Sequence, residues 1–243
     1  MAKLKLSPRL SGIAGEIAKL GTQDMIYEIG ADHAYLPIYL VQEGACAAAS
    51  ASDISEKSLR RAVANASERG FSGRIKFYPG DGFSAFTEYI TGKIVIIAGI
   101  GGVKLAEILA EGAERAKLAS LLILQPMHNH EALRKWLWEN AFEISYELLV
   151  PEGRRIYSLL FCKYAGAPQP YAQTDLYAGK KVLYANNGEY LHFLRFTLRK
   201  ITNRLDGVNA SAAAGNASGA VIDERKRLEA VTVDIKRKIM ELS

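Results

Sequence analysis

Cysteine and long apolar runs are both scarce in this chain of 243 residues. The two cysteines, Cys46 and Cys162, lie far apart in apolar stretches, which excludes a disulfide framework and a cysteine-rich zinc site. No uninterrupted apolar run approaches the roughly 18 residues that mark a membrane helix, and the first residues lack an apolar signal core. We therefore expect a cytoplasmic protein that makes no contact with a membrane.

A strong excess of either charge is also missing from most of the chain. Hydrophobic residues make up 49% of the sequence and charged residues 23%, which is typical of a folded globular protein. Residues 1–169 hold 19 Lys and Arg against 18 Asp and Glu, whereas residues 170–243 hold 12 against 8. The excess of positive charge in the last third favours a polyanionic partner there. On charge alone, an ordinary solvated helix surface explains it equally well.

Short β-rich runs alternate with helical patterns in the first two thirds of the chain. The alternating runs are residues 25–29, 45–52, 74–78, 93–98 and 120–124. This alternation predicts βαβ units and a mostly parallel sheet. Two further runs, 142–150 and 154–162, are separated by only three residues, so they must form an antiparallel hairpin. The expected fold is α/β, with the Rossmann-like seven-stranded sheet and antiparallel last strand of class I methyltransferases.

The last part of the chain has a different apolar pattern. Leu191, Leu194, Leu198, Ile201 and Leu205 step by 3, 4, 3 and 4 residues, and a similar stripe runs through residues 228–242. This spacing predicts a pair of coiled-coil-like helices, although two helices packed on the core are the simpler alternative. The low-complexity segment 206–220 between the stripes favours a flexible connection. We expect two domains, residues 1–165 with the sheet and residues 166–243 with a small α-helical hairpin.

An acidic residue and a glycine turn end the first predicted strand. The segment Glu28-Ile29-Gly30-Ala31-Asp32 does not match the GxGxxG pattern of dinucleotide-binding proteins. Gly30 allows a tight turn and a close approach of the backbone to a ligand. Because Asp32 would lie unfavourably beside a bound pyrophosphate, the pattern argues against NAD or ATP. It favours a cationic ligand without phosphate, such as S-adenosylmethionine.

The next strands also end in acidic or glycine-rich segments. Asp53 follows the glycine turn by about 20 residues, where a carboxylate can bind ribose hydroxyls, and it or Ser55 could cap the next helix. Asp81 could accept a hydrogen bond from an adenine amino group. The glycines of segment 98–102 predict the close approach of a cofactor or target base. The expected cofactor-binding residues are Glu28, Gly30, His33, Asp53, Ile54, Asp81, Gly82, Ala98 and Gly99.

The tripeptide His128-Asn129-His130 is a weak candidate for a metal site. No further zinc ligands stand at the required spacing from these residues. We interpret them instead as the cap of the following helix, which carries Arg134 and Trp136. No bound metal is expected.

Several strings of the sequence resemble one known family. They are LSPRL (6–10), IGADHAYLP (29–37), GDG (80–82), IAGIGG (97–102) and LILQP (122–126), and they cover about residues 4–163 in order. These strings are similar to those of the bacterial tRNA (adenine-N1)-methyltransferases that modify position twenty-two in the D-arm. The resemblance implies a class I methyltransferase domain followed by a coiled-coil-like domain. It also implies S-adenosylmethionine as cofactor and tRNA as partner.

In such an enzyme Asp32 is the expected catalytic group. Its carboxylate would accept a hydrogen bond from the amino group of the target adenine and stabilise the positive charge that grows on the ring. Tyr35 is the second catalytic candidate, and either it or His33 could stack on the base. Because N1 is a Watson–Crick atom, the base must first be unpaired or flipped out. The candidate RNA-binding residues are Arg9, Arg195, Arg199, Lys200 and Arg204.

The chain departs from the family pattern at several positions. The family usually has Ser, Met and Asn where this chain has Ala31, Ile100 and Met127, and an acid where Lys93 stands. Two alternatives therefore stay open, a non-catalytic tRNA-binding protein that keeps the fold and, less well supported, a nicotinamide-linked oxidoreductase. The sequence favours a monomer but does not determine the oligomeric state.

Overall fold

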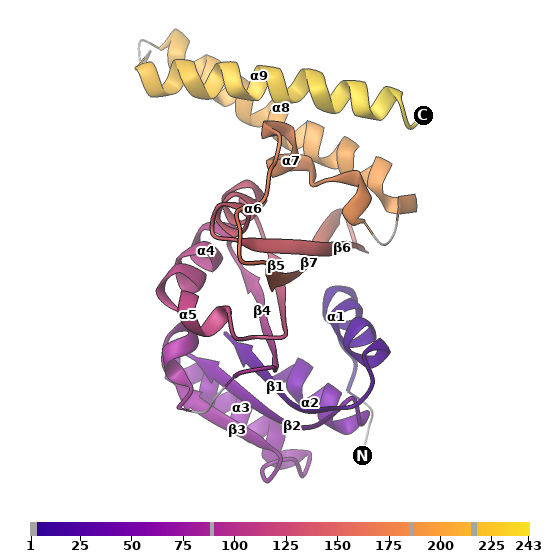
Figure 1. Cartoon of the computed structure of the whole chain (residues 1–243), viewed down its shortest axis with the longest axis vertical. Coiled ribbons are helices and arrows are strands. Elements are labelled where there is room, and N and C mark those ends of the chain that lie inside the picture. Colours follow the sequence, from indigo (N-terminus) through magenta and orange to yellow (C-terminus); the bar gives the residue numbers. More distant parts are fainter. Residues whose placement is uncertain (1–3, 88–89, 185–186, 215–217) are drawn as a thin grey trace. The chain divides into compact units, whose positions relative to one another are not determined.

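The computed structural model describes residues 4–87, 90–184, 187–214 and 218–243 (Figure 1). The chain divides into two compact units, Met1–Gln169 and Pro170–Ser243. The first unit contains the sheet, and the second is helical. Among the described residues, none of the helices combines the length and apolar character that crossing a membrane requires.

The first unit is built on a seven-stranded sheet. Its strands are β1 (Gln23–Ile29), β2 (Cys46–Asp53), β3 (Ile75–Pro79), β4 (Ile94–Ile100), β5 (Leu121–Pro126), β6 (Phe142–Glu152) and β7 (Arg155–Tyr164). Their order is β3-β2-β1-β4-β5-β7-β6. Strands β1 to β5 pair in parallel, and β7 runs antiparallel to both of its neighbours. The predicted class I methyltransferase sheet is confirmed.

One helix precedes the first strand, and the others lie between successive strands of this sheet. They are α1 (Pro8–Lys19), α2 (Tyr35–Gln42), α3 (Glu56–Glu68), α4 (Gly102–Glu111), α5 (Ala113–Ala116) and α6 (His130–Glu139), with the short 3₁₀ helix η1 (Gly82–Ala85). A helical pattern of apolar residues runs through residues 102–116 of the sequence, but the helix is broken at Gly112, between α4 and α5. Gly112 has a φ of −103° and a ψ of 20°, outside the helical range, and a Cβ atom there would lie 2.4 Å from the ring of Phe83, so close packing requires a glycine.

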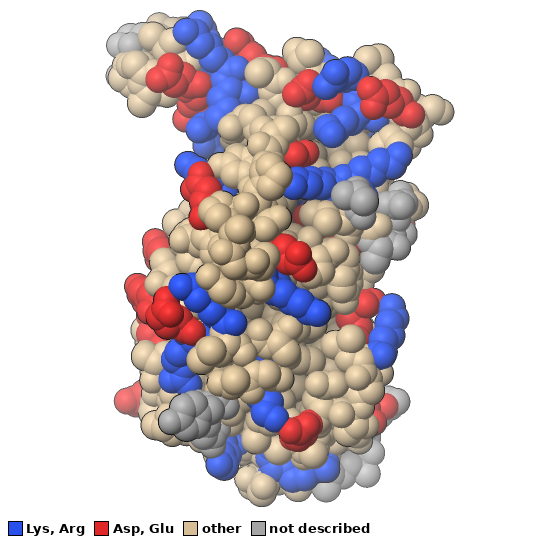
Figure 2. All heavy atoms as spheres, viewed as in Figure 1, with Lys and Arg blue, Asp and Glu red and all other residues tan. Residues whose placement is uncertain are grey.

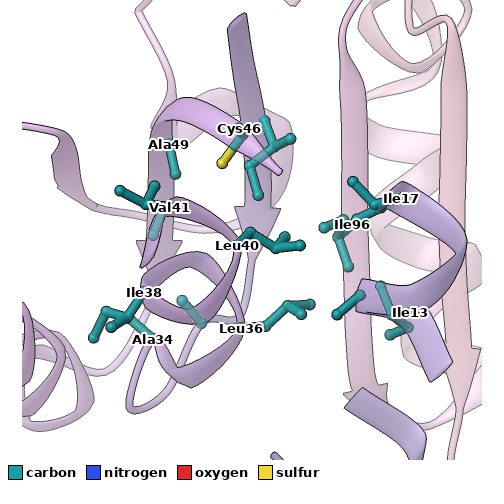
Figure 3. Packing of buried hydrophobic residues seen from close by; sticks show 14 of the residues in the cluster. Ile13, Ile17, Ala34, Leu36, Ile38, Leu40, Val41, Cys46, Ala49 and Ile96 are labelled. Carbon is teal, nitrogen blue, oxygen red and sulfur yellow. The ribbon is translucent and has the colours of Figure 1, made fainter. Parts of the chain in front are cut away.

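The apolar face of α1 packs into the main core. Pro8 occupies the first turn, where its missing N–H costs no hydrogen bond. Ile13 and Ile17 are fully buried, and Figure 3 shows them facing the sheet residue Ile96. Burying a side chain of this size stabilises the fold by about 1.5–3 kcal/mol. This packing holds the start of α1 at the edge of the cleft into which the strand ends open.

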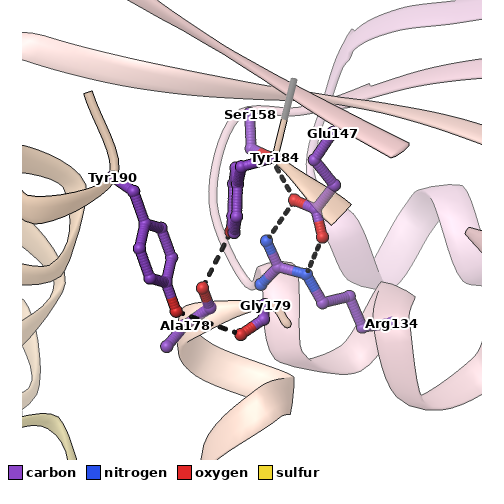
Figure 4. Close-up of polar contacts among 7 residues, drawn as sticks. All are labelled: Arg134, Glu147, Ser158, Ala178, Gly179, Tyr184 and Tyr190. Carbon is purple, nitrogen blue, oxygen red and sulfur yellow. Dashed lines mark hydrogen bonds and ion pairs between the residues drawn. The ribbon is translucent and has the colours of Figure 1, made fainter. Parts of the chain in front are cut away.

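An ion pair is buried between α6 and the β6–β7 hairpin. Arg134 makes two hydrogen bonds to the carboxylate of Glu147, at 3.1 and 2.7 Å, and both side chains are fully buried (Figure 4). The hydroxyl of Ser158 donates to the same carboxylate. The Glu147 carboxylate therefore joins α6, β6 and β7, and its hydrogen bonds within the protein replace the hydrogen bonds to water that burial removes.

The second unit contains α7 (Gln173–Ala178), the 3₁₀ turns η2 (Lys181–Leu183) and η3 (Asn187–Glu189), and the long helices α8 (Tyr190–Ala213) and α9 (Gly219–Met240). Helices α8 and α9 pack against each other, as the two apolar stripes predicted. Leu194 and Ile201 of α8, and Leu228, Val231 and Ile235 of α9, are buried. Near the start of this unit, the Tyr184 hydroxyl donates to the carbonyl oxygen of Ala178 at 2.8 Å (Figure 4).

The predicted flexible segment 206–220 is mostly helical. Helix α8 continues to Ala213, and α9 begins at Gly219. Alanine has the highest helix propensity, which offsets the cost of Gly207. Arg204 also makes a 2.7 Å ion pair with Glu224 of α9, which supports the extended helix. The connection between the two helices is residues 214–218, and residues 215–217 within it lie outside the described residues.

Candidate functional site

A cleft of about 660 Å³ opens at the carboxyl ends of β1 to β4. The strand order reverses between β1 and β4, and this switch point is where open α/β sheets bind ligands. The cleft brings together all the residues that the sequence predicted to be catalytic or cofactor-binding. They are Glu28, Gly30, Asp32, His33, Tyr35, Asp53, Ile54, Asp81, Gly82, Ala98 and Gly99.

The turn after β1 fixes the position of Asp53. Gly30 has a φ of +75°, and its N–H donates to the carbonyl oxygen of Ser52 at 2.8 Å. The backbone N–H of Asp32 then donates to Asp53 Oδ2 at 2.9 Å, while Oδ1 accepts from the N–H of Ser55 at 2.8 Å. Ser55 itself caps α3 through the N–H of Ser58. Because an ionised carboxylate has about four acceptor positions, Asp53 retains capacity for a ligand.

Asp32 lies at the mouth of the cleft in a strained conformation. Its φ is +46°, and Ala34 two residues later has a φ of +55°, a region that residues other than glycine seldom adopt. The Asp32 side chain is 63% exposed, and its Oδ2 lies 3.6 Å from His33 Nε2. The ring of His33 stacks on Tyr35, with centroids 5.2 Å apart. The turn therefore presents an accessible carboxylate next to a flat pair of rings.

Glu28 provides a buried acid on the inner wall of the cleft. Only 5% of the residue is exposed, and its Oε2 has no hydrogen-bond partner among the described residues. Burial raises the pKa of Glu28 to about 8, with smaller contributions from the charges of Asp53 and Asp32. A positively charged ligand would satisfy this oxygen and offset the cluster of negative charge. The arrangement thus fits S-adenosylmethionine, which is cationic, better than a phosphate-bearing cofactor.

Three further cleft residues were not singled out by sequence reasoning. Lys5 and Ser7 come from the segment before α1, and Ser7 Oγ is buried without a partner among the described residues. Lys104 of α4 lies 3.6 Å from Asp81 Oδ2. Ser7 lies within the LSPRL string, which was the only sequence signal for this wall. Nothing local to Lys104 indicates that it faces the acid at the end of β3.

The glycines at the end of β4 and just after it have two different explanations. Gly99 lines the cleft with a φ of +80°, as expected for a close approach of ligand. A Cβ atom at Gly101 would lie 2.5 Å from the ring of His128, and one at Gly102 would lie 2.1 Å from the carbonyl oxygen of Asn129. Protein packing, rather than a ligand, therefore explains the last two glycines, and the prediction was wrong for them.

The predicted cap of α6 is confirmed in position only. Asn129 occupies the N-cap position of α6 in a left-handed conformation, and its side chain makes no capping hydrogen bond. The carbonyl oxygen of His128 instead accepts from the N–H of Gly102 at 2.8 Å. The loop is thus held against the start of α4.

The candidate RNA-binding residues fall into two groups. Arg9 lies in the cleft of the first unit, where its Nη1 donates to Gln125 Oε1 at 2.9 Å. The other four lie on α8, where Figure 2 shows basic and acidic side chains interspersed over the C-terminal helices. Arg199 and Lys200 both lie over the ring of Phe196, and Arg204 is paired with Glu224. Arg195, Arg199 and Lys200 are exposed.

Comparisons with known proteins identify the family to which the chain is similar. Residues 26–227 match the family model described as tRNA (adenine(22)-N(1))-methyltransferase. The Bacillus subtilis protein of that name is 30% identical over 182 residues, which cover 75% of this chain and 75% of that protein.

Solved structures of similar fold extend over nearly the whole chain. A Streptococcus agalactiae protein described as a member of the NADB-Rossmann superfamily is 29% identical, with a TM-score of 0.76 over 95% of this chain and 98% of that one. The structure of M. capricolum TrmK with the natural cofactor product S-adenosyl-homocysteine is 27% identical, with a TM-score of 0.73 over 95% of this chain and 98% of that one. Because the family model matches most of the sequence, including every strand after the first few residues of β1, the chain belongs to the tRNA (adenine(22)-N(1))-methyltransferase family.

Proposed function

We propose that the cleft of the first unit carries out methyl transfer from S-adenosylmethionine to N1 of the adenine at position 22 of tRNA. The observation that carries this proposal is the convergence of Glu28, Asp32, Asp53 and Asp81 on one cleft, with Glu28 buried and its Oε2 without a partner among the described residues. A cationic ligand would satisfy the unpartnered oxygen of Glu28, whereas a polyphosphate would lie unfavourably beside the exposed carboxylate of Asp32. When bound, the cofactor supplies an electrophilic methyl group on a sulfonium.

Specific residues are assigned to hold this cofactor. Asp53, already oriented by two backbone N–H groups, accepts hydrogen bonds from the ribose hydroxyls. Asp81 accepts a hydrogen bond from the adenine amino group of the cofactor, and Glu28 faces the positively charged end of the cofactor. The backbone or side chains of the remaining predicted residues contact the cofactor at close range: Gly30, His33, Ile54, Gly82, Ala98 and Gly99.

Asp32 is assigned the catalytic role toward the target base. Adenine N1 has a lone pair in the ring plane, so it needs no general base before it attacks. Positive charge then develops on the ring and reaches the exocyclic amino group. The exposed Asp32 carboxylate at the cleft mouth accepts from that amino group and stabilises the charge. The stacked pair of His33 and Tyr35 provides a surface for the flipped base.

The second predicted domain, residues 166–243, is assigned to RNA binding through its helix α8. Arg195, Arg199 and Lys200 are exposed cations on α8, and such residues bind phosphates irrespective of sequence. Arg204 belongs to the same set, although its guanidinium also contacts Glu224. Because the proposed substrate is tRNA, the cytoplasm is the location that we expect for the protein.

The proposal is tested by transfer of labelled methyl to unmodified tRNA and to the same tRNA with guanine at position 22. We expect label only on the adenine-bearing tRNA. The variant Asp32→Asn should lower kcat by about 100-fold, as expected when one charge-stabilising group is removed. Its cofactor affinity should change by less than about threefold, because the assigned contact is made to the base.

Asp24→Asn is the matched control, because Asp24 is an exposed acid at the opposite end of β1. It should transfer methyl at the parent rate. Equal labelling of both tRNAs would refute the target base, and full activity of Asp32→Asn would refute the role of Asp32.

A further inference from the structure

Strand β4 is irregular where it forms the wall of the cleft. Its pairing with β5 shifts register between Ala98 and Ile100, and Gly99 lies between them with a φ of +80°. The N–H of Gly99 donates to the side-chain Oε1 of Gln125 at 3.0 Å. Because Ala98, Gly99 and Ile100 all line the cleft, a side chain of β5 holds the conformation of this wall.

Gln125 is fully buried, and both ends of its amide are engaged. Oε1 accepts from Gly99 and also from Arg9 Nη1 at 2.9 Å, while Nε2 donates to the carbonyl oxygen of Pro126 at 3.0 Å. Reversing the amide would place its N–H₂ group against two other donors. The orientation of Gln125 is therefore held by two donors on Oε1, the Gly99 N–H and the Arg9 guanidinium, and Arg9 is the one of the two that reaches it from a distant part of the chain.

Arg9 reaches this amide from the first turn of α1. Its guanidinium lies 5.8 Å from the ring centroid of Tyr157, and its backbone N–H donates to Glu152 Oε2 at 3.2 Å. A Cβ atom at Gly99 would lie 3.4 Å from Arg9 Nη1, so the guanidinium is also in close contact with the irregular strand end. Arg9 thus joins α1, the β6–β7 hairpin and the wall of the cleft.

Met127 lies next to both Gln125 and Arg9. Its sulfur lies 3.5 Å from Gln125 Nε2 and 3.9 Å from Arg9 Nη1. A thioether is a weak acceptor, so Met127 does not compete with Gln125 for the guanidinium. The amide of Gln125 remains the strong acceptor for Arg9 in this chain.

We infer that Arg9 is a positioning residue for methyl transfer, acting through Gln125 to hold the Gly99 backbone in the conformation that the reaction needs. This inference rests on the proposed function and deepens it. It gives Arg9 a role inside the cleft, in place of the phosphate contact that the sequence predicted. Arg9, Gln125 and Gly99 together form what we call the relay.

The relay is tested with the full-length variants Arg9→Met, Arg9→Lys and Gln125→Met, and with Arg9→Met/Gln125→Met. We expect Arg9→Met to lower kcat by about tenfold or more, because misplacement of the cleft wall disturbs alignment. KM for tRNA and the Kd for S-adenosylmethionine should stay within about threefold of the parent values. Arg9→Lys should restore much of kcat, because its ammonium can still donate to Gln125. The double variant should be no slower than the slower single variant.

Arg60→Met is the matched control, since Arg60 is an exposed arginine of α3 whose ion pair is with a neighbouring surface acid, Glu56. Its kcat should equal that of the parent. A second readout, hydrogen exchange of the Gly99 amide without tRNA, should accelerate in Arg9→Met and stay unchanged in Arg60→Met.

Three results would overturn the inference. An increase in KM for tRNA at constant kcat would make Arg9 a phosphate contact. Equal loss of kcat in Arg9→Lys and Arg9→Met would show that donation to Gln125 is not what matters. Unchanged hydrogen exchange of the Gly99 amide in Arg9→Met would show that Arg9 does not hold this backbone through Gln125, whatever the activity of the variant. If the parent does not methylate tRNA while Gly99 exchange accelerates, the proposed function fails and with it the role in methyl transfer, but the structural relay stands.

Discussion

Replacement of Glu28 by glutamine should change how both stability and cofactor binding depend on pH. The carboxyl is buried in the cleft wall, its Oε2 lacks a partner among the described residues, and burial raises its pKa from an ordinary 4.5 to about 8. The folded protein therefore keeps this proton over a range in which the unfolded chain has already released it. A group with a raised carboxyl pKa lowers stability as the pH rises between these two values.

The expected magnitude follows from the pKa values. Between about pH 4.5 and pH 8, the free energy of unfolding should fall by up to about 1.4 kcal/mol per pH unit through this residue alone. The total is at most about 5 kcal/mol. The amide of Glu28→Gln does not ionise, so the variant should lack this component. Urea unfolding of both proteins without cofactor, from pH 5 to pH 8, measures the difference.

Cofactor binding should show the opposite dependence. A cationic ligand in the cleft stabilises the ionised Glu28, so binding expels its proton, and affinity should rise by up to about tenfold per pH unit below pH 8. Calorimetry at pH 7 in buffers of different ionisation enthalpy should show close to one more proton released by the parent than by Glu28→Gln. Taking the difference cancels any proton exchange by the ligand itself. Parallel stability curves together with equal proton release would refute the assigned environment of Glu28.

Two further predictions concern other parts of the chain. Replacing Arg199 and Lys200 by alanine should weaken tRNA binding and reduce the slope of log affinity against log salt concentration by about one to two. The control replaces the exposed pair Arg60 and Arg61 of α3 by alanine and should leave that slope unaltered. Equal slopes for the parent and both variants would show that α8 does not contact the RNA. Arg134→Met leaves the fully buried Glu147 without its ion-pair partner and should cost about 3–5 kcal/mol in denaturant unfolding, while adding Glu147→Leu should recover most of that loss. A double variant as unstable as the single one would contradict this account.

Much of the fold could be predicted because its signals are local. The β-rich runs matched β1 to β7 to within about two residues, since alternation of apolar runs and helical patterns depends on neighbours in sequence. The gap of three residues before β7 was decisive, because it leaves no room for a crossover. The helical pattern of residues 102–116 does not reveal the break between α4 and α5, because the ring of Phe83 against Gly112 is a tertiary contact. Segment 206–220 was predicted too flexible because its alanines support α8.

The candidate site, too, could be predicted in part from local signals, and in part it depends on tertiary contacts. The carboxyl ends of parallel strands meet at one edge of a sheet, so strand polarity alone predicts that the strand-end residues Glu28, Asp32, Asp53 and Asp81 share one cleft. The glycines at 101 and 102 were interpreted as ligand contacts because sequence alone does not reveal the loop of residues 128–129 packed against them.

The sequence by itself determined the order of strands and helices, the hairpin that reverses the last strand, and the set of acids that converges on the cleft. These follow from periodicity, gap length and strand polarity, which act over short stretches of chain. Only the tertiary structure decided that Glu28 is buried within the cleft wall, and that Arg9 donates to Gln125 in the cleft. Burial and hydrogen bonding between segments far apart in sequence depend on packing in three dimensions, and no local pattern encodes them.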